Sequence, residues 1–330
     1  MALSTKKPAV SGVNPFLPIY LESLMIDTIL DFDLFIRLGR DMVLYRSKLL
    51  PFTERTRQKL MGNNVMQLFV PVTAKGEYQR YIETNLSRIV QDPLIEEEKK
   101  AAIVYDASKA LVKDVLANPN LGENIHRSQS LVSTQVSYVL SGREAFLNLM
   151  RITSFDYYTY THSVNVCTFA IALANQLGIT NSDELKTLGQ GALLHDVGKS
   201  RISERILKKK SSLNNAEIEI IRKHPRWGQE ILKESDIIPE TAYYPVLQHH
   251  ERIDGSGYPY GVAGHEIHDF GKIVAICDVF DALTTRRVYQ NAMGSYPALK
   301  EMYNKGAAYD ERFLREFTVL MGPDNYMSKK

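Results

Sequence analysis

The sequence is poor in cysteine, has no marked excess of charge of either sign, and lacks a long hydrophobic run. Its two cysteines, Cys167 and Cys277, both lie in apolar helical patterns, which argues against a disulfide framework. Lys and Arg number 40 against 38 Asp and Glu, so the formal net charge is +2. This balance argues against a protein that coats DNA or RNA or lies on a membrane surface.

Segments that would direct the chain into or across a membrane are also missing from the pattern. No apolar run approaches the roughly 18 residues that a membrane helix needs. The first residues, MALSTKKPAVSG, lack the apolar core of a signal peptide. With 44% hydrophobic and 24% charged residues, the composition is that of a soluble globular protein. We therefore expect a cytoplasmic protein.

The first part of the chain predicts a flexible arm followed by a small α+β domain. Residues 1–18 carry three prolines among small residues, which is typical of a loose arm. Over residues 19–92, the segments DLFI, MVLYR and VMQLFV indicate short strands, with Gly39 between the first two. Thr53 is a candidate helix cap, and a second helix is expected from about Glu77. This domain holds no cluster of His, Asp and Glu, so we expect it to regulate rather than to catalyse.

Residues 93–150 form two long helical patterns that we expect to connect the domains. Apolar positions recur there at spacings of four and three: Ala101, Tyr105, Ser108, Val112 and Val115 in the first pattern, and Val132, Val136, Val139, Phe146 and Met150 in the second. Such a repeat can dimerise two chains as a coiled coil or pack two helices within one chain. Two or three heptads do not separate these alternatives, so a homodimer stays open.

Residues 151–330 are expected to be helical and to carry the chemistry. Seven potential metal ligands lie on or at the ends of apolar helix faces there: His162, His195, Asp196, His224, His249, His250 and Asp278. A lone histidine is more often a core or surface residue than a ligand, but here five helices deliver imidazole or carboxylate together. A buried carboxylate in the apolar run KIVAICDVF would be costly without a cation.

The stretch GALLHDVGKS shows how such ligands could share one site. The spacing of Leu188, Ala192 and His195 predicts an inward helix face that ends in His195 and Asp196. Adjacent residues of a helix project about 100° apart, so Asp196 could bridge two ions. One tetrahedral ion needs three or four protein ligands, and seven are therefore too many for one ion. Imidazole and carboxylate without thiolate suit Zn, Mn, Fe or Ni.

Four motifs, taken together, resemble those of a known family. HDVGK at 195–199, HPRWGQEIL at 224–232, HHERIDGSGYP at 249–259 and DVFDALTTRRVY at 278–289 are similar, in this order, to the motifs of the HD-GYP family. That family is a branch of the HD-domain metallohydrolases, and the likeness covers about residues 155–320. It implies a mainly α fold, with a helical HD-type domain at 151–330 after the small α+β domain.

The resemblance also implies roles for individual residues. His162, His195, Asp196 and Asp278 match the ligands that HD hydrolases share, and Asp196 matches the carboxylate that bridges two ions. His224, His249 and His250 match the ligands that add the second ion. The implied cofactors are two divalent ions, iron or manganese, with zinc and nickel as alternatives.

Further residues match positions that meet the substrate. Lys199 matches the lysine that reaches the scissile phosphate, and Asp196 and Lys199 are the expected catalytic pair. Arg287 matches an arginine that meets the nucleotide's phosphates, and Gly257 and Tyr258 belong to the Gly-Tyr-Pro loop that names the family. This loop also serves protein contacts in the family. Val288 replaces the proline of the usual Arg-Pro-Tyr, Gln290 replaces the basic residue that often follows it, and Lys272 stands where an arginine is usual. These departures put ligand affinity in doubt rather than metal binding.

The implied activity is hydrolysis of cyclic di-GMP to linear pGpG, or onward to GMP, by attack of a hydroxide that bridges the two ions. One alternative is an HD phosphohydrolase for another nucleotide. Another is a cyclic di-GMP receptor or scaffold of low turnover that keeps the metal site. Some family members hold a third ion through a carboxylate four residues before the first histidine. Here Tyr158 takes that position and Asp156 faces elsewhere on a helix, so we expect two ions.

Overall fold

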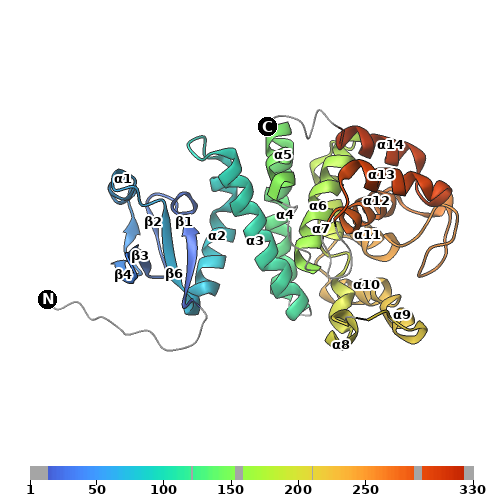
Figure 1. The fold of residues 1–330 in the computed structure, drawn as a ribbon, viewed down its shortest axis with the longest axis horizontal. Helices are drawn as coiled ribbons and strands as arrows, with labels where there is room; N and C mark the ends of the chain where they lie inside the picture. Colours follow the sequence, from blue (N-terminus) through green and yellow to red (C-terminus); the bar gives the residue numbers. More distant parts are fainter. Residues whose placement is uncertain (1–13, 120–121, 153–158, 210, 286–291, 323–330) are drawn as a thin grey trace. The chain divides into compact units, whose positions relative to one another are not determined.

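A computed structural model describes residues 14–119, 122–152, 159–209, 211–285 and 292–322 (Figure 1). The chain divides after Asn85 into two compact units, which we describe separately. A small unit with a β-sheet comes first and a helical unit follows, so the expected fold class is confirmed. Among the described helices, none combines the length and the apolar character that crossing a membrane requires.

The first unit contains a four-stranded antiparallel sheet in the order β1–β6–β3–β4. The short strands β2 and β5 pair with each other as a second, two-stranded sheet. Gly39, at φ +62°, turns the chain between β3 and β4, and the side chain of Thr53 caps α1, as predicted. The elements are β1 (Phe16–Tyr20), β2 (Thr28–Ile29), β3 (Leu34–Leu38), β4 (Asp41–Arg46), β5 (Pro51–Phe52), α1 (Glu54–Gly62), β6 (Gln67–Pro71) and the first part of α2 (Lys75–Gln91), within which the division falls.

The end of the expected arm is a strand, which corrects the prediction for residues 16–18. Leu17 and Ile19 alternate along β1 and pack on the core of this unit, so pairing with β6 gains apolar burial. Pro18 is compatible with the strand because β1 lies at the edge of the sheet, where a missing N–H costs no ladder hydrogen bond. Residues 1–13 lie outside the described ranges.

The second unit is helical, and α6 lies at its centre. α6 contacts α3, α4, α5, α7, α12 and α14, and its residues from Thr161 to Ala174 are all buried. In Figure 1, α6 and α7 lie between α3–α5 on one side and α11–α14 on the other. The helices are α3 (Glu97–Ala117), α4 (Gly122–Leu140), α5 (Arg143–Ile152), α6 (Thr159–Gln176), α7 (Ser182–Leu193), α8 (Glu204–Leu207), α9 (Asn215–Ile221), α10 (His224–Ser235), α11 (Tyr243–Gln248), α12 (Asp269–Thr284), α13 (Ser295–Asn304) and α14 (Glu311–Leu320).

The apolar repeats of residues 93–150 are buried inside this unit. α3 packs on α4, α5 and α6, while α4 also packs on α7. A Cβ added to Gly189 of α7 would lie 2.7 Å from the side chain of Val132, so these two helices approach closely. Of the two explanations of the repeats, packing within one chain therefore accounts for them.

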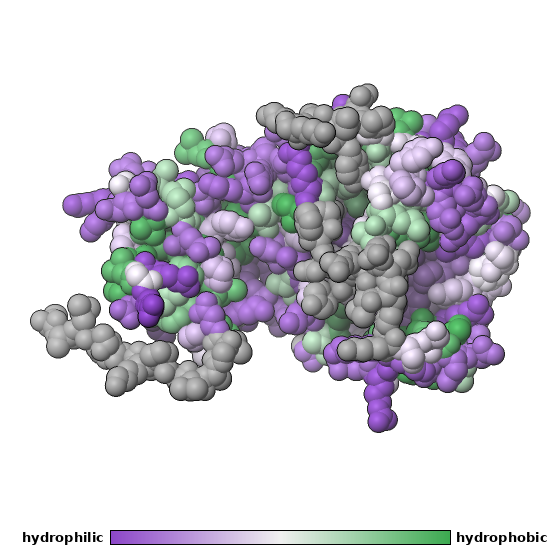
Figure 2. Space-filling view, viewed as in Figure 1, coloured by the Kyte–Doolittle hydropathy of each residue, from purple (hydrophilic) through white to green (hydrophobic). Residues whose placement is uncertain are grey.

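On the face shown in Figure 2, hydrophilic residues predominate and hydrophobic ones are scattered.

Candidate metal centre

The first ligand candidate, His162, lies in the first turn of α6, with its side chain 1% exposed. Its Nδ1 atom lies 2.6 Å from Oδ2 of Asp281, so the ring donates to that carboxylate. The other ring nitrogen, Nε2, lies 3.0 Å from Oδ1 of Asp278 and 3.9 Å from Oδ2 of Asp196. The bond to Asp281 thus orients the imidazole with Nε2 toward the carboxylates.

His195 and Asp196 lie in a turn, which corrects the helix expected through them. α7 ends at Leu193, and the 3₁₀ helix η3 (Val197–Arg201) begins after Asp196. Nδ1 of His195 donates to the carbonyl oxygen of Ala192 at 2.7 Å, and its Nε2 is buried without a hydrogen-bond partner among the described residues. After this turn the adjacent side chains of His195 and Asp196 are both buried.

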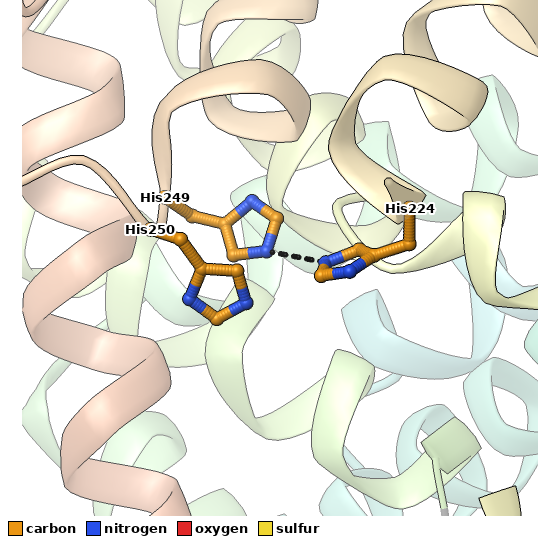
Figure 3. A group of neighbouring side chains, drawn as sticks. All are labelled: His224, His249 and His250. Atoms are coloured by element: carbon orange, nitrogen blue, oxygen red, sulfur yellow. Dashed lines mark hydrogen bonds between the residues drawn. The ribbon is translucent and has the colours of Figure 1, made fainter. Parts of the chain in front are cut away.

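The remaining three histidines come from two other helix ends (Figure 3). His224 begins α10, with Pro225 in the first turn as the sequence predicts, and His249 and His250 follow α11 directly. Nδ1 of His224 donates to the carbonyl oxygen of Ile221 at 2.7 Å, and Nδ1 of His249 donates to that of Pro245 at 2.9 Å. Both rings then present Nε2 to the same point, 3.1 Å apart.

Six of the seven predicted ligands fall into two groups, which Asp196 and the seventh ligand, Asp278, join. His162, His195 and Asp196 form one group, and His224, His249 and His250 form the other; within each, the potential ligand atoms lie within 4.8 Å of one another.

Asp196 lies between the two groups. Its Oδ2 lies 3.5 Å from Nε2 of His195, in the first group, while its Oδ1 lies 3.3 Å from Nε2 of His224, in the second. Asp278 makes a second link, because its Oδ2 lies 3.7 Å from Nδ1 of His250 while its Oδ1 is the oxygen beside His162.

The electrostatics favour neutral imidazoles at His224, His249 and His250 and ionised carboxylates at Asp196 and Asp278. Burial lowers the pKa of His224 to about 4 and holds the pKa values of His249 and His250 well below the ordinary value. Burial opposes ionisation of Asp196, but Lys199 and His195 outweigh it and hold its pKa well below the usual range. Burial also opposes ionisation of Asp278, but the neighbouring His162 and His250 outweigh it and hold its pKa well below the usual range. These are the protonation states that a metal cation requires of its ligands.

The donor set fits divalent metal ions. Several atoms that accept rather than donate converge in a buried space: the two Nε2 atoms of the second group, Nε2 of His195, and Oδ1 of Asp196, which has no hydrogen-bond partner among the described residues. Buried lone pairs without donors are costly, and a cation would relieve that cost. Nitrogen and carboxylate oxygen without thiolate suit Fe, Mn, Zn or Ni.

The Gly-Tyr-Pro loop folds back onto the second group. The backbone N–H of Tyr258 donates to the carbonyl oxygen of His250 at 3.2 Å, and the two rings stack with centroids 4.6 Å apart. A Cβ at Gly257 would lie 2.4 Å from Cα of Glu251, so only glycine allows this approach. The guanidinium of Arg222 lies over the Tyr258 ring, 5.4 Å from its centroid.

Three further predictions concern Lys199, Arg287 and the third ion. Lys199 lies in η3, with its ammonium 2.6 Å from Oδ2 of Asp196 and its side chain 20% exposed. Arg287 lies outside the described residues, as do Val288 and Gln290. Tyr158 and Asp156, on which the expected number of ions depends, also lie outside them.

Two buried residues that support His162 were not among the predicted site residues. Asp281 accepts from His162 as described above, and it also accepts at Oδ1 from the side-chain amide of Asn165 at 2.7 Å. Both residues left a signal in the sequence. Asp281 follows Asp278 by three positions on an otherwise apolar helix, and Asn165 follows His162 by three, so each lies on the same helix face as a ligand candidate.

Comparison with known proteins identifies the family. A family model described as HD domain matches residues 144–313, about half of the chain. The chain belongs to the HD domain family. The family membership that the motifs implied is therefore confirmed.

Individual relatives of this HD domain protein include cyclic dinucleotide phosphodiesterases. The chain is 34% identical over 231 residues to cyclic di-GMP phosphodiesterase PA4108 of Pseudomonas aeruginosa, covering 69% of this chain and 56% of that protein. It is 38% identical over 145 residues to 3'3'-cGAMP-specific phosphodiesterase 3 of Vibrio cholerae, covering 44% of this chain and 31% of that protein. The chain spans about half the length of the curated relatives that it matches first.

A solved structure shares the fold of this HD domain protein. It is that of Bd1817, a HDG"Y"P protein from Bdellovibrio bacteriovorus, with a TM-score of 0.64 over 93% of this chain and all of the other. Because the two sequences are only 22% identical, this likeness concerns the fold alone.

Proposed function

We propose that this HD domain protein is a metal-dependent phosphodiesterase that hydrolyses cyclic di-GMP to linear pGpG. The observation that carries the proposal is the position of Asp196, whose two oxygens face two separate groups of ligand atoms. A carboxylate so placed suits a centre of two divalent ions, iron or manganese before zinc or nickel. The names of similar proteins support the substrate, since they include several cyclic di-GMP phosphodiesterases.

In this proposal, His162, His195, Asp196 and Asp278 hold one ion, and His224, His249 and His250 hold the other with the second oxygen of Asp196. Two ions bound there would supply an activated water and neutralise charge on the phosphate. The Nδ1 donations to backbone carbonyls and to Asp281 keep the histidine rings in place before any ligand arrives. Such preorganisation lowers the cost of binding.

The substrate would approach where the site is open. Asp196 and His195 are fully buried, whereas Lys199 is 20% and His250 18% exposed at the side chain. A phosphodiester entering beside these two residues would meet the ammonium of Lys199, which stabilises the charge that develops as water adds to phosphorus. Tyr258, stacked on His250, borders the same opening. We propose that Arg287 also binds the phosphates of the nucleotide.

The other parts of the chain complete the proposal. We assign regulation of turnover to the unit that contains the β-sheet, and both metal-ligand groups of the described structure lie in the helical unit. The Gly-Tyr-Pro loop offers a contact for protein partners beside its role at His250. We also propose a cytoplasmic location for the protein.

The proposal is tested by loading the protein with Mn²⁺ or Fe²⁺ and following cyclic di-GMP by chromatography. We expect pGpG to accumulate and Asp196→Asn to abolish both turnover and most of the bound metal, measured by elemental analysis. Asp254→Asn, which changes an exposed carboxylate of the loop, serves as the matched control and should keep both. A full metal content in Asp196→Asn would contradict the bridging role. Binding of cyclic di-GMP without turnover would instead favour a receptor.

A second substrate is favoured by one comparison, the likeness to a phosphodiesterase named for 3'3'-cGAMP. Both molecules present the same cyclic phosphodiester linkages to the metals, so discrimination lies in the base contacts. Measuring kcat/KM for both substrates with the same preparation decides between them. We expect cyclic di-GMP to be preferred, and a preference for 3'3'-cGAMP would correct the substrate but not the chemistry.

A further inference from the structure

A chain of buried hydrogen bonds runs from α3 to the first ligand group. The phenol of Tyr105 on α3 donates to Oδ1 of Asn165 on α6 at 3.1 Å. The amide of Asn165 donates to Oδ1 of Asp281 on α12 at 2.7 Å, and Oδ2 of Asp281 accepts from Nδ1 of His162 at 2.6 Å. Three helices are thus linked through side chains that end at a metal-ligand candidate.

Every member of this chain is buried. Tyr105 is 4% exposed, Asn165 is fully buried, and Asp281 and His162 are 1% exposed. Hydrogen bonds in such an environment are stronger than in water and polarise one another. The direction of donation is also defined throughout, because a phenol that donates to the amide oxygen of Asn165 turns the amide nitrogen toward Asp281. The carboxylate of Asp281 then receives donors on both oxygens.

Tyr105 lies well outside the part of the chain that the family model matches. That match begins at residue 144, and Tyr105 belongs to a helix that ends at Ala117. The phenol stays neutral at physiological pH, since burial and the nearby carboxylate of Asp281 raise its pKa above the ordinary value. The ammonium of Lys109 lies 4.7 Å from the centroid of the Tyr105 ring and is itself paired with Asp106 at 2.7 Å.

We propose that Tyr105 is a positioning residue of the metal centre, acting through Asn165 and Asp281 on the orientation of His162. In this arrangement the phenol fixes the amide, the amide fixes the carboxylate, and the carboxylate holds the proton on Nδ1 of His162 so that Nε2 is the ligand atom. Partners that orient a ligating histidine in this way tune its affinity for metal. α3 is then a functional part of the centre. The inference rests on the metal binding of the proposed function, not on its substrate.

A second buried tyrosine provides the control. Tyr138 on α4 is 1% exposed, and its phenol donates to the backbone carbonyl oxygen of Glu97 at 2.9 Å. This bond also joins two helices, but it does not lead to a ligand candidate. Tyr105→Phe and Tyr138→Phe each remove one phenol oxygen and one buried hydrogen bond, from α3 and α4, two helices that pack on each other. A purely structural role predicts similar consequences for the two variants.

The experiment measures Mn²⁺ affinity in the full-length protein by competition with a chelating dye, together with the unfolding temperature of the metal-free form. We expect Tyr105→Phe to weaken the tighter Mn²⁺ site about threefold to tenfold, the range of one lost hydrogen bond. Asp281→Asn should weaken it about 10- to 100-fold. Tyr138→Phe should lower the unfolding temperature while leaving Mn²⁺ affinity within about twofold of the wild type.

A double-mutant cycle tests whether Tyr105 acts through Asp281. In the Asp281→Asn background, Tyr105→Phe should change Mn²⁺ affinity little, because the chain is already broken. ¹⁵N chemical shifts of the metal-free protein give an independent readout, and Tyr105→Phe should shift His162 Nδ1 whereas Tyr138→Phe should not. Unchanged Mn²⁺ affinity and an unchanged His162 signal in Tyr105→Phe would overturn the inference, as would equal effects of the two tyrosine variants. Absence of Mn²⁺ binding by the wild type would contradict the proposed function instead, and the His162 signal would still decide the role of Tyr105.

Discussion

Nζ of Lys199 lies 2.6 Å from Oδ2 of Asp196, the carboxylate oxygen on the side of His162 and His195. The two residues are three positions apart, and the 3₁₀ turn that follows Asp196 brings them together. The ammonium therefore lies at the edge of the first ligand group before any ligand arrives. A cation held there can meet a phosphate without a large movement of the chain.

Lys199→Met tests whether this charge serves the reaction or the metal. We expect the bound metal to stay near the wild-type content and turnover of cyclic di-GMP to fall about 100-fold or more, since the ammonium matters most as charge develops. Lys186→Met is the matched control, because Lys186 forms an exposed pair of the same spacing with Asp183 at 3.0 Å. Loss of metal together with activity in Lys199→Met would show a structural role.

The loop at residues 252–263 is expected to support His250 through its backbone. In Gly257→Ala the added Cβ would lie 2.4 Å from Cα of Glu251 and 2.5 Å from the carbonyl oxygen of His250, so the loop has to move away. We expect one of the two ions to be lost or bound more weakly and turnover to fall at least tenfold.

Gly264→Asn is the control for this variant. It adds a side chain in the same region where nothing lies within 4 Å, at a φ of +53° that asparagine tolerates. Elemental analysis of both variants checks the prediction. Equal metal content and turnover in Gly257→Ala and the wild type would show that the loop does not support the ligand.

The stability of the metal-free protein should depend on pH through its buried histidines. The pKa of His224 falls from 6.5 to about 4 on burial, so the unfolded chain takes up a proton there before the folded chain does. The contribution of His224 to the free energy of unfolding is therefore fully present above pH 6.5 and is lost as the pH falls toward 4. The slope is up to about 1.4 kcal/mol per pH unit for each such group. His249 and His250 are shifted in the same direction.

Thermal unfolding of the metal-free protein between pH 7 and 5 measures this loss. His224→Asn should flatten the dependence, because it removes one of the groups that binds a proton only after unfolding. His126→Asn, at an exposed position, should leave the slope as in the wild type. A steeper or unchanged slope in His224→Asn would contradict the assigned shift.

Much of the site could be predicted from the sequence because its ligands interrupt regular patterns. His162 and Asp278 interrupt helices whose buried residues are mostly apolar, and Pro225 marks the helix that begins at His224. Helix periodicity alone did not reveal that α7 ends at Leu193. The side chain of His195 still points inward after the turn, so its spacing from Ala192 resembles that of a continuing helix.

Residues that act across long distances in the sequence were beyond prediction. Tyr105 occupies a position of the apolar repeat, where an aromatic ring is expected for packing, and nothing local marks its phenol. Its partner Asn165 is 60 positions away, and this pairing depends on how α3 crosses α6. The strand at Phe16 was missed for a similar reason, since its pairing with β6 outweighs the prolines beside it.

The central claim is that Asp196 bridges two metal ions, and the number and position of those ions test it most directly. Anomalous diffraction from crystals of the Mn²⁺-loaded protein would locate them. We expect two peaks, one bounded by His162 and His195 and one by His224 and His249, each beside a different oxygen of Asp196. A third strong peak near Tyr158 or Asp156 would correct the number of ions, and a single peak, or two peaks that do not share Asp196, would contradict the account.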